Sequence, residues 1–419
     1  METGSREGSS RRNLAMPKAG AFPVPDAYEA VLARAEQRLK SWEAIYKQER
    51  AEAIWLVTEL LSHPPERREL FVRNSARFHT WGVFERLLLK SWENMFSSPQ
   101  QAESLAHLAL LLSDHLDPAY GEEVIEDLRA RAWGYIGNAL RIRSDLSGSE
   151  QAFRRAWFHL RQGTGDPVER AMFLDLAASL LRAQRRFDFA IRLLRRALKL
   201  VLSVGDQHRA GRILVSMDVI HHQAGTPERG IPLLYRALEL IDPETEPRLL
   251  LCVWHNLVDD LAEIGRFMEA RKLFQKSREL YRLSPEWAYH RRRWVAGKIA
   301  VGLGQDDEGE ELLREAHHGF KSDEAAYDVA LISLELSALY AKQGRTTEIK
   351  QLAADMVPFF SSHQIHREAA AALAFWKQAV DTESAGIELA TQIVGFLKRA
   401  RYDSDFPFVE PEARVPPSG

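Results

Sequence analysis

Two neighbouring segments of the sequence carry side chains that could bind a metal ion or transfer protons. The first contains Asp218 and His222, and the second contains Cys252, His255 and Asp259. The second set has the spacing i, i+3 and i+7, which places its members on one face of a helix. If the two helices lie side by side, the aspartates and histidines could form the transition-metal site of a metal-dependent hydrolase. The alternative, which we favour, is a polar groove wall with one buried cysteine, because this two-helix spacing is not a recognised ligand motif.

The rest of the sequence lacks the short motifs that mark common enzymes. It has no Gly-rich phosphate loop ending in Lys and Ser or Thr, no G-x-G-x-x-G, no G-x-S-x-G and no H-E-x-x-H. The formal net charge of −3 over 419 residues gives no global field that would favour nucleic acid or an anionic membrane. No run approaches the ~18 apolar residues that cross a bilayer. The single cysteine suits a reducing compartment. We therefore expect a non-catalytic, cytoplasmic protein without a cofactor.

The sequence is locally basic between residues 151 and 212. This stretch holds thirteen Lys and Arg against five Asp and Glu. Such a surface could attract an acidic protein partner and, less readily, nucleic acid. Because Arg favours helices, most of these cations are expected on the solvated face of a helix. The aromatic residues in the stretch, such as Phe153 and Trp157, have the spacing of core packing rather than of base-stacking platforms.

The elements that would position these side chains repeat along the chain. Gly225, Gly265, Gly304 and Gly344 are separated by 40, 39 and 40 residues, and each follows one helical stretch and precedes another. Glycine at a helix end can adopt the left-handed conformation without steric cost. The spacing predicts successive helical hairpins that each turn at one of these glycines.

The second helix of each predicted hairpin carries a small, a large and a small residue at offsets of four and three. These offsets keep the three side chains on one face, where small residues let backbones approach and the large one fills the gap between units. One hairpin cannot bury its apolar face alone, so several must stack. The sets are Ser149/Phe153/Ala156, Ala190/Leu194/Ala197, Gly230/Leu234/Ala237, Ala270/Phe274/Ser277 and Gly309/Leu313/Ala316.

This pattern resembles the tetratricopeptide repeat (TPR) family. The likeness is clearest in Trp133 with Ile136-Gly137, in Arg186-Phe187-Asp188 before Ala190, and in Gly265-Arg266-Phe267 before Ala270. The family repeat is about 34 residues, and the longer repeat here resembles the TPR sensor domains of bacterial peptide-sensing regulators. The resemblance implies an all-α fold, a right-handed α-solenoid of stacked antiparallel helical hairpins that binds a protein or peptide in its concave groove.

The same interpretation divides the chain into five parts. We expect a disordered tail at 1–25, an N-terminal helical cap or divergent repeats at 26–96, TPR-like repeats at 97–360, a C-terminal capping helical hairpin at 361–401 and a second disordered tail at 402–419.

In the TPR family the first helices of the hairpins line the groove, and the resemblance transfers those positions to this chain. An Asn there can hold a peptide backbone amide in both directions, and an Arg can bind a carboxylate through two hydrogen bonds. Asn138, with Arg131 and Arg141, is therefore the central candidate. The full predicted set is Arg131, Asn138, Arg141, Asp175, Arg182, His222, His255, Asp259, Trp294 and Lys298.

Three functions remain open at this point. The first is a scaffold that binds a protein or peptide in its groove. The second is a regulatory sensor, in which a ligand tightens or relaxes the solenoid and so controls a transcription or signalling partner. The third, which we favour least, is the metal-dependent hydrolase. The sequence does not identify the partner, and it does not decide between a monomer and a homodimer.

Overall fold

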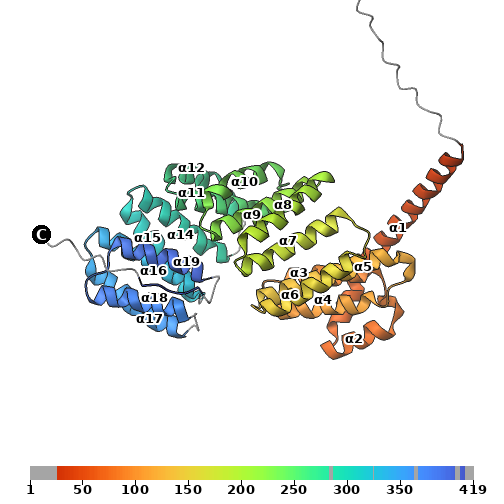
Figure 1. The fold of residues 1–419 in the computed structure, drawn as a ribbon, viewed down its shortest axis with the longest axis horizontal. Coiled ribbons are helices and arrows are strands. Elements are labelled where there is room, and N and C mark those ends of the chain that lie inside the picture. The colour runs from red at the N-terminus through yellow and green to blue at the C-terminus, as the bar shows by residue number, and fades with distance from the viewer. Residues whose placement is uncertain (1–25, 283–285, 324, 363–366, 402–405, 411–419) are drawn as a thin grey trace, which may run out of the picture.

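A computed structural model describes residues 26–282, 286–323, 325–362, 367–401 and 406–410. Within these ranges the regular secondary structure is helical and contains no strand. Figure 1 shows an elongated, curved stack of helices, with α1 extending from one end and α14 to α19 at the other. The predicted tail at 1–25, and residues 402–405 and 411–419 of the second tail, lie outside the described residues.

The helices follow one another as antiparallel pairs after an N-terminal group. That group consists of α1 (Asp26–Ser62), α2 (Pro65–Asn74), α3 (Trp81–Asn94) and α4 (Pro99–Ser113), with short 3₁₀ helices at Ala76–Phe78 and Pro118–Tyr120. The pairs are α5 (Glu122–Ile142) with α6 (Leu146–Leu160), α7 (Pro167–Ala183) with α8 (Phe187–Ser203), α9 (Gln207–Gln223) with α10 (Pro227–Leu240), α11 (Pro247–Glu263) with α12 (Phe267–Lys276), α14 (Glu286–Gly302) with α15 (Asp306–Ser322), α16 (Ala326–Lys342) with α17 (Thr346–Ser362), and α18 (Arg367–Asp381) with α19 (Ile387–Ala400). A short helix, α13 (Arg278–Arg282), follows α12.

The hairpin turns confirm the predicted glycine period and extend it. Gly225, Gly265, Gly304 and Gly344 have φ angles of 73°, 79°, 76° and 70°, in the left-handed region. The same conformation occurs at three turns without glycine, at Ser144 (φ 65°), Arg185 (φ 56°) and Glu383 (φ 58°). These three positions continue the spacing in both directions, so the turn geometry repeats from α5 to α19.

Exchanging residues at these turns should shift stability in opposite directions. No atom lies within 4 Å of a Cβ built on Gly225, so Gly225→Ala adds only backbone strain, which costs about 1 kcal/mol. We expect this variant to unfold at lower urea concentration than the wild type. Ser144→Gly relieves the same strain at an equivalent turn and should unfold at an equal or higher concentration. A Gly225→Ala variant with an unchanged urea midpoint would contradict the strain account.

The core follows the small–large–small sets. Ala190, Leu194 and Ala197 are buried, and the other four sets are also buried apart from a half-buried Phe274. Gly137 shows why small residues are needed, because a Cβ there would lie 3.0 Å from the Phe153 ring in the partner helix α6. Burial at these positions joins neighbouring hairpins into shared apolar clusters, one from α7 to α14 and another from α15 to α19.

The C-terminal end departs from the simple stack. Helix α19 packs on α16, while α18 packs on α17, and the end of α19 reaches back to much earlier segments. Lys398 Nζ lies 2.5 Å from Glu263 Oε1 at the end of α11, and Arg185 Nη1 donates to the Arg399 carbonyl at 3.2 Å. These contacts hold α19 beside the first helices of the central hairpins.

The segment after α19 differs from the predicted disordered tail where the structure describes it. The Phe406 ring stacks on Phe396 with centroids 5.6 Å apart, and Phe408 packs edge-on against Phe375 at 5.8 Å. The apolar rings find partners on α18 and α19, and this burial orders residues 406–410. None of the described helices combines the length and apolar character that a membrane span requires.

Candidate functional site

A cavity of about 620 Å³ lies where the first helices of several hairpins meet α19. Its walls come from α9, α10, α11, α14, α16 and α19. We call it the charged cavity, because its lining includes the cations Arg291, Lys298, Lys398, Arg399 and Arg401 and the acids Glu228, Asp259 and Glu263. Five of the ten predicted site residues line it, namely His222, His255, Asp259, Trp294 and Lys298.

Lys298 is the central cation of the charged cavity. Its Nζ lies 2.6 Å from Asp259 Oδ1 and 3.5 Å from Glu263 Oε2, and its side chain is only 15% exposed. Burial alone would lower the pKa of Lys298, but the two carboxylates raise it above its usual range. Burial would likewise raise the pKa of Asp259, yet Lys298 holds it well below its usual range. The pair therefore stays charged at neutral pH.

The pKa values of the two histidines of the cavity are shifted in opposite directions. His255 Nδ1 lies 3.0 Å from the Tyr281 hydroxyl, and burial lowers the pKa of His255 to about 4, so this imidazole is neutral. His222 Nδ1 lies 2.6 Å from Asp260 Oδ1. Burial alone would lower the pKa of His222, but the hydrogen bond to Asp260 raises it. His222 therefore gains a proton more readily than His255.

Trp294 gives the cavity an aromatic wall. Its indole Nε1 donates to Glu335 Oε2 at 2.6 Å, which fixes the ring, and Lys298 Nζ lies 5.7 Å from the ring centroid. Burial raises the pKa of Glu335. A ligand in the cavity would meet a fixed indole plane beside several cations and acids.

The predicted metal-ligand group is not assembled. Helices α9 and α11 do lie side by side, but Asp218 Oδ2 accepts from Asn256 Nδ2 at 3.0 Å, and His222 pairs with Asp260. Across the described ranges, no three His, Cys, Asp or Glu side chains converge as metal ligands. Cys252 is exposed rather than buried. The interpretation as a hydrolase therefore loses the site on which it depended.

The predicted group around Asn138 is also placed differently. Asn138 is buried, with 3% of its surface exposed, and its Oδ1 accepts from Arg141 Nε at 3.0 Å and Arg141 Nη2 at 2.8 Å. Arg141 folds back by one turn over Asn138, so the amide does not stand open to a peptide as we expected. Arg131 is paired with Glu169 of α7, at 3.2 Å through its Nε. None of the three lines the charged cavity.

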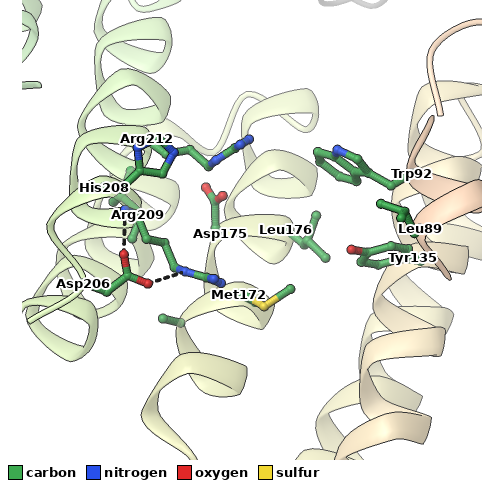
Figure 2. A pocket seen from close by; sticks show the side chains of 12 residues that line it. Leu89, Trp92, Tyr135, Met172, Asp175, Leu176, Asp206, His208, Arg209 and Arg212 are labelled. Carbon is green, nitrogen blue, oxygen red and sulfur yellow. Dashed lines mark hydrogen bonds and ion pairs between the residues drawn. The ribbon is translucent and has the colours of Figure 1, made fainter. Parts of the chain in front are cut away.

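Asp175 and Arg182 lie elsewhere on the first helices. Both line a small cavity of about 90 Å³ between α7 and α9. Asp175 also borders a larger pocket toward α3 and α5, shown in Figure 2. The structure thus brings five predicted residues, Lys298 among them, together in the charged cavity. The other five lie along α5 and α7.

Four of the five cations of the charged cavity are missing from the predicted set, and three of the four come from one distant segment. Lys398, Arg399 and Arg401 come from α19 and the residue after it, far from the central hairpins in sequence. No local sequence pattern predicts that α19 packs back onto these hairpins. The basic stretch has the predicted solvated face, because Arg192, Arg195, Arg196 and Lys199 are exposed on α8. The prediction that Trp157 packs in the core is wrong, because its side chain is 46% exposed.

Comparisons with known proteins relate this architecture to solved structures. No protein-family profile matches the sequence, and no curated protein is significantly similar to it. The crystal structure of a Rap protein complexed with competence and sporulation factor aligns with a TM-score of 0.55 and 12% identity, covering 76% of this chain and 87% of that one. Aspartyl phosphate phosphatase F from Bacillus subtilis aligns with a TM-score of 0.53 and 12% identity, covering 80% and 89%.

The fold and these likenesses define the class of protein. The chain has an all-α, TPR-like solenoid fold built from stacked antiparallel hairpins, as the repeat predicts. At 12% identity the likeness extends to the fold of the two solved structures and not to what either protein does.

Proposed function

We propose that this protein is a non-catalytic scaffold that binds a peptide or protein segment in the charged cavity. The observation that carries the proposal is the cavity itself, because it is about 620 Å³ in volume and brings side chains from six helices to one concave site. One of the two similar structures, the Rap protein, is a complex with a factor. Its fold therefore accommodates a bound partner, which supports the same use here.

The cavity lining favours an acidic ligand. Five cations line it against three acids, but four of the five already lie beside carboxylates. Lys298 is held by Asp259 and Glu263, Lys398 by Glu263, and Arg291 and Arg401 by Asp328. Arg399 is exposed and, within the described part of the chain, its guanidinium contacts only the Gly395 carbonyl and the Phe406 ring. A guanidinium without an acidic partner can bind a carboxylate through two hydrogen bonds. We therefore expect a peptide with Asp or Glu side chains.

A peptide selection on the purified protein tests the proposal. Peptides enriched from a random display library should contain acidic residues, and their affinity, measured by fluorescence anisotropy, should fall with added salt. Arg399→Glu should weaken binding about tenfold. Arg154→Glu, which reverses an exposed arginine on α6, serves as the matched control and should bind like the wild type. A library that yields no binder, or equal binding by both variants, would contradict the proposal.

The contacts of α19 favour one second function, that of a ligand-responsive sensor. Lys398 and Arg399 line the cavity and at the same time contact Glu263 and Arg185. A ligand that binds these residues would change the contacts that hold α19 in place, and so bias the solenoid between two states. In a sensor, hydrogen exchange of the α19 amides should change on binding. In a plain scaffold, only residues at the ligand should be protected.

A further inference from the structure

A second pocket, with a volume of about 280 Å³, lies on the first helices toward the N-terminus, between α3, α5, α7 and α9. Seven of its lining side chains are apolar or aromatic, and two of them, Leu89 and Trp92, are 44% and 36% exposed. The Trp92 and Tyr135 rings lie 5.8 Å apart. Met172 and Leu176 complete this apolar wall. We call the site the aromatic pocket. A ligand that covers its exposed apolar surface would bind favourably, because apolar surface is removed from water.

The opposite wall of the aromatic pocket is polar. Figure 2 shows Arg209, Arg212 and Asp175 facing Trp92 and Tyr135 across the pocket. In the described residues, each arginine side chain makes hydrogen bonds through a single nitrogen, Arg209 Nε to Asp206 at 2.9 Å and Arg212 Nη2 to Glu246. The remaining N–H groups of both guanidinium groups stay available as donors.

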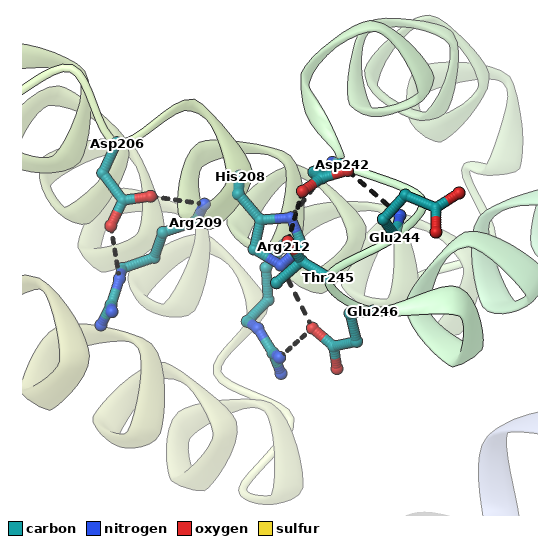
Figure 3. A network of polar contacts seen from close by, with 8 residues as sticks. All are labelled: Asp206, His208, Arg209, Arg212, Asp242, Glu244, Thr245 and Glu246. Atoms are coloured by element: carbon teal, nitrogen blue, oxygen red, sulfur yellow. Dashed lines mark hydrogen bonds and ion pairs between the residues drawn. The ribbon is translucent and has the colours of Figure 1, made fainter.

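The arginines are held in place by a network that Figure 3 shows in full. Asp206 caps α9 by accepting from the Arg209 backbone N–H at 2.9 Å, and the same carboxylate fixes the Arg209 side chain. Glu246 binds Arg212 and also lies 3.3 Å from His208 Nε2. These anchors reduce the entropy that the two donors would lose when a ligand binds.

Asp175 supplies an acceptor beside these donors. Its Oδ1 has no hydrogen-bond partner and is screened from solvent. Burial raises the pKa of Asp175, although Ser216 and the neighbouring arginines oppose the rise. An acceptor without a partner in such a place costs free energy, which a ligand N–H could recover. The polar wall therefore offers donors and an acceptor side by side, the complement of a peptide group.

We propose that the aromatic pocket binds one aromatic or large aliphatic side chain of the bound peptide. The apolar wall covers that side chain. The C=O of the adjacent peptide group accepts a hydrogen bond from Arg209 or Arg212, and its N–H donates one to Asp175. This subsite rests on the proposed function and specifies the ligand. Arg212 and His222, one from each site, are ten residues apart on α9, or about 15 Å. An extended peptide covers that distance in about five residues.

A small probe tests the pocket without any knowledge of the natural ligand. N-acetyl-phenylalaninamide, followed by saturation-transfer NMR on the full chain, should give a signal that N-acetyl-alaninamide does not. Trp92→Ala and Leu89→Glu should both abolish the signal. Trp157→Ala, which removes an exposed tryptophan of α6, is the matched control and should retain it. A signal that survives both pocket variants, or no signal for the wild type, would overturn the proposal.

Two further comparisons test the role of the polar wall and the binding of a whole peptide, each separately from the apolar wall. Asp175→Asn should reduce the signal of the amide probe but leave that of toluene, which lacks the peptide group, unchanged. A peptide with an acidic residue five positions from a phenylalanine should lose about tenfold or more in affinity when the phenylalanine becomes alanine. If acidic peptides bind but this change has no effect, the aromatic subsite is wrong and the proposed function stands. If the amide probe binds and no peptide does, the proposed function is wrong and the pocket stands.

Discussion

Asp218→Asn is expected to raise the free energy of unfolding, most of all at alkaline pH. Asp218 is fully buried and accepts one hydrogen bond, from Asn256 Nδ2, while its Oδ1 and Asp260 Oδ2 lack partners. Both oxygens face Gly230, where a Cβ would lie 2.2 Å from the first and 3.2 Å from the second. Burial and the Asp260 carboxyl raise the pKa of Asp218 to about 9. An asparagine keeps the bond to Asn256 and can donate to Asp260, without a charge.

The sign of the pH dependence follows from this raised pKa. In the unfolded chain Asp218 loses its proton near its ordinary pKa of about 3.9, whereas in the folded chain it keeps the proton to about 9. The stability that Asp218 contributes is therefore complete below pH 4 and is lost as the pH rises toward 9. For one proton the slope is about 1.4 kcal/mol per pH unit.

Urea unfolding at pH 5, 7 and 8 checks this expectation. The Asn variant should gain stability over the wild type as the pH rises, by about 4 kcal/mol between pH 5 and pH 8. Asp381→Asn, which changes an exposed aspartate of α18, should give a small difference that stays constant with pH. Parallel pH curves for the wild type and Asp218→Asn would show that Asp218 is not protonated in the folded protein.

The repeat could be predicted from sequence because it depends on local chemistry. The four glycines mark turns that need a left-handed residue, and the buried sets mark the helix faces that pack. The turns at Ser144, Arg185 and Glu383 could not be recognised, because these residues adopt φ angles of 65°, 56° and 58° without the glycine that signals them. There the packing of neighbouring hairpins outweighs about 1 kcal/mol of backbone strain.

The candidate site could be predicted only in part, since helical periodicity gives the face of a residue but not what covers it. The cluster at His255, Asp259 and Lys298 was found because first helices lie side by side. Asn138 has the same helical register, but Arg141 covers it. The fold alone brings Lys398 and Arg399 to the cavity, across more than 130 residues from their contacts at Glu263 and Arg185.

Lys298→Met is expected to lower the free energy of unfolding by about 2–3 kcal/mol at neutral pH. The change leaves the Asp259 carboxylate without the ammonium 2.6 Å away, and Glu263 loses the same ammonium at 3.5 Å. Removing one partner of a fully buried pair costs about 3–5 kcal/mol, and we reduce this figure because both carboxylates are partly exposed. Urea unfolding measures the loss. Lys350→Met, which breaks an exposed pair with Glu383, should cost less than about 0.5 kcal/mol.

The cost should fall at low pH, and it should be partly reversed by a second change. Lys298 holds the pKa of Asp259 below its usual range, so the stability from this pair is present at neutral pH and lost as the pH falls below about 4. The wild type and Lys298→Met should therefore converge in acid. Adding Asp259→Leu removes the stranded carboxylate and should restore stability, because an apolar pair can replace a buried ion pair at little cost. Additive losses in the double variant would show that Lys298 and Asp259 are not coupled, and would contradict the ion pair as the source of the loss.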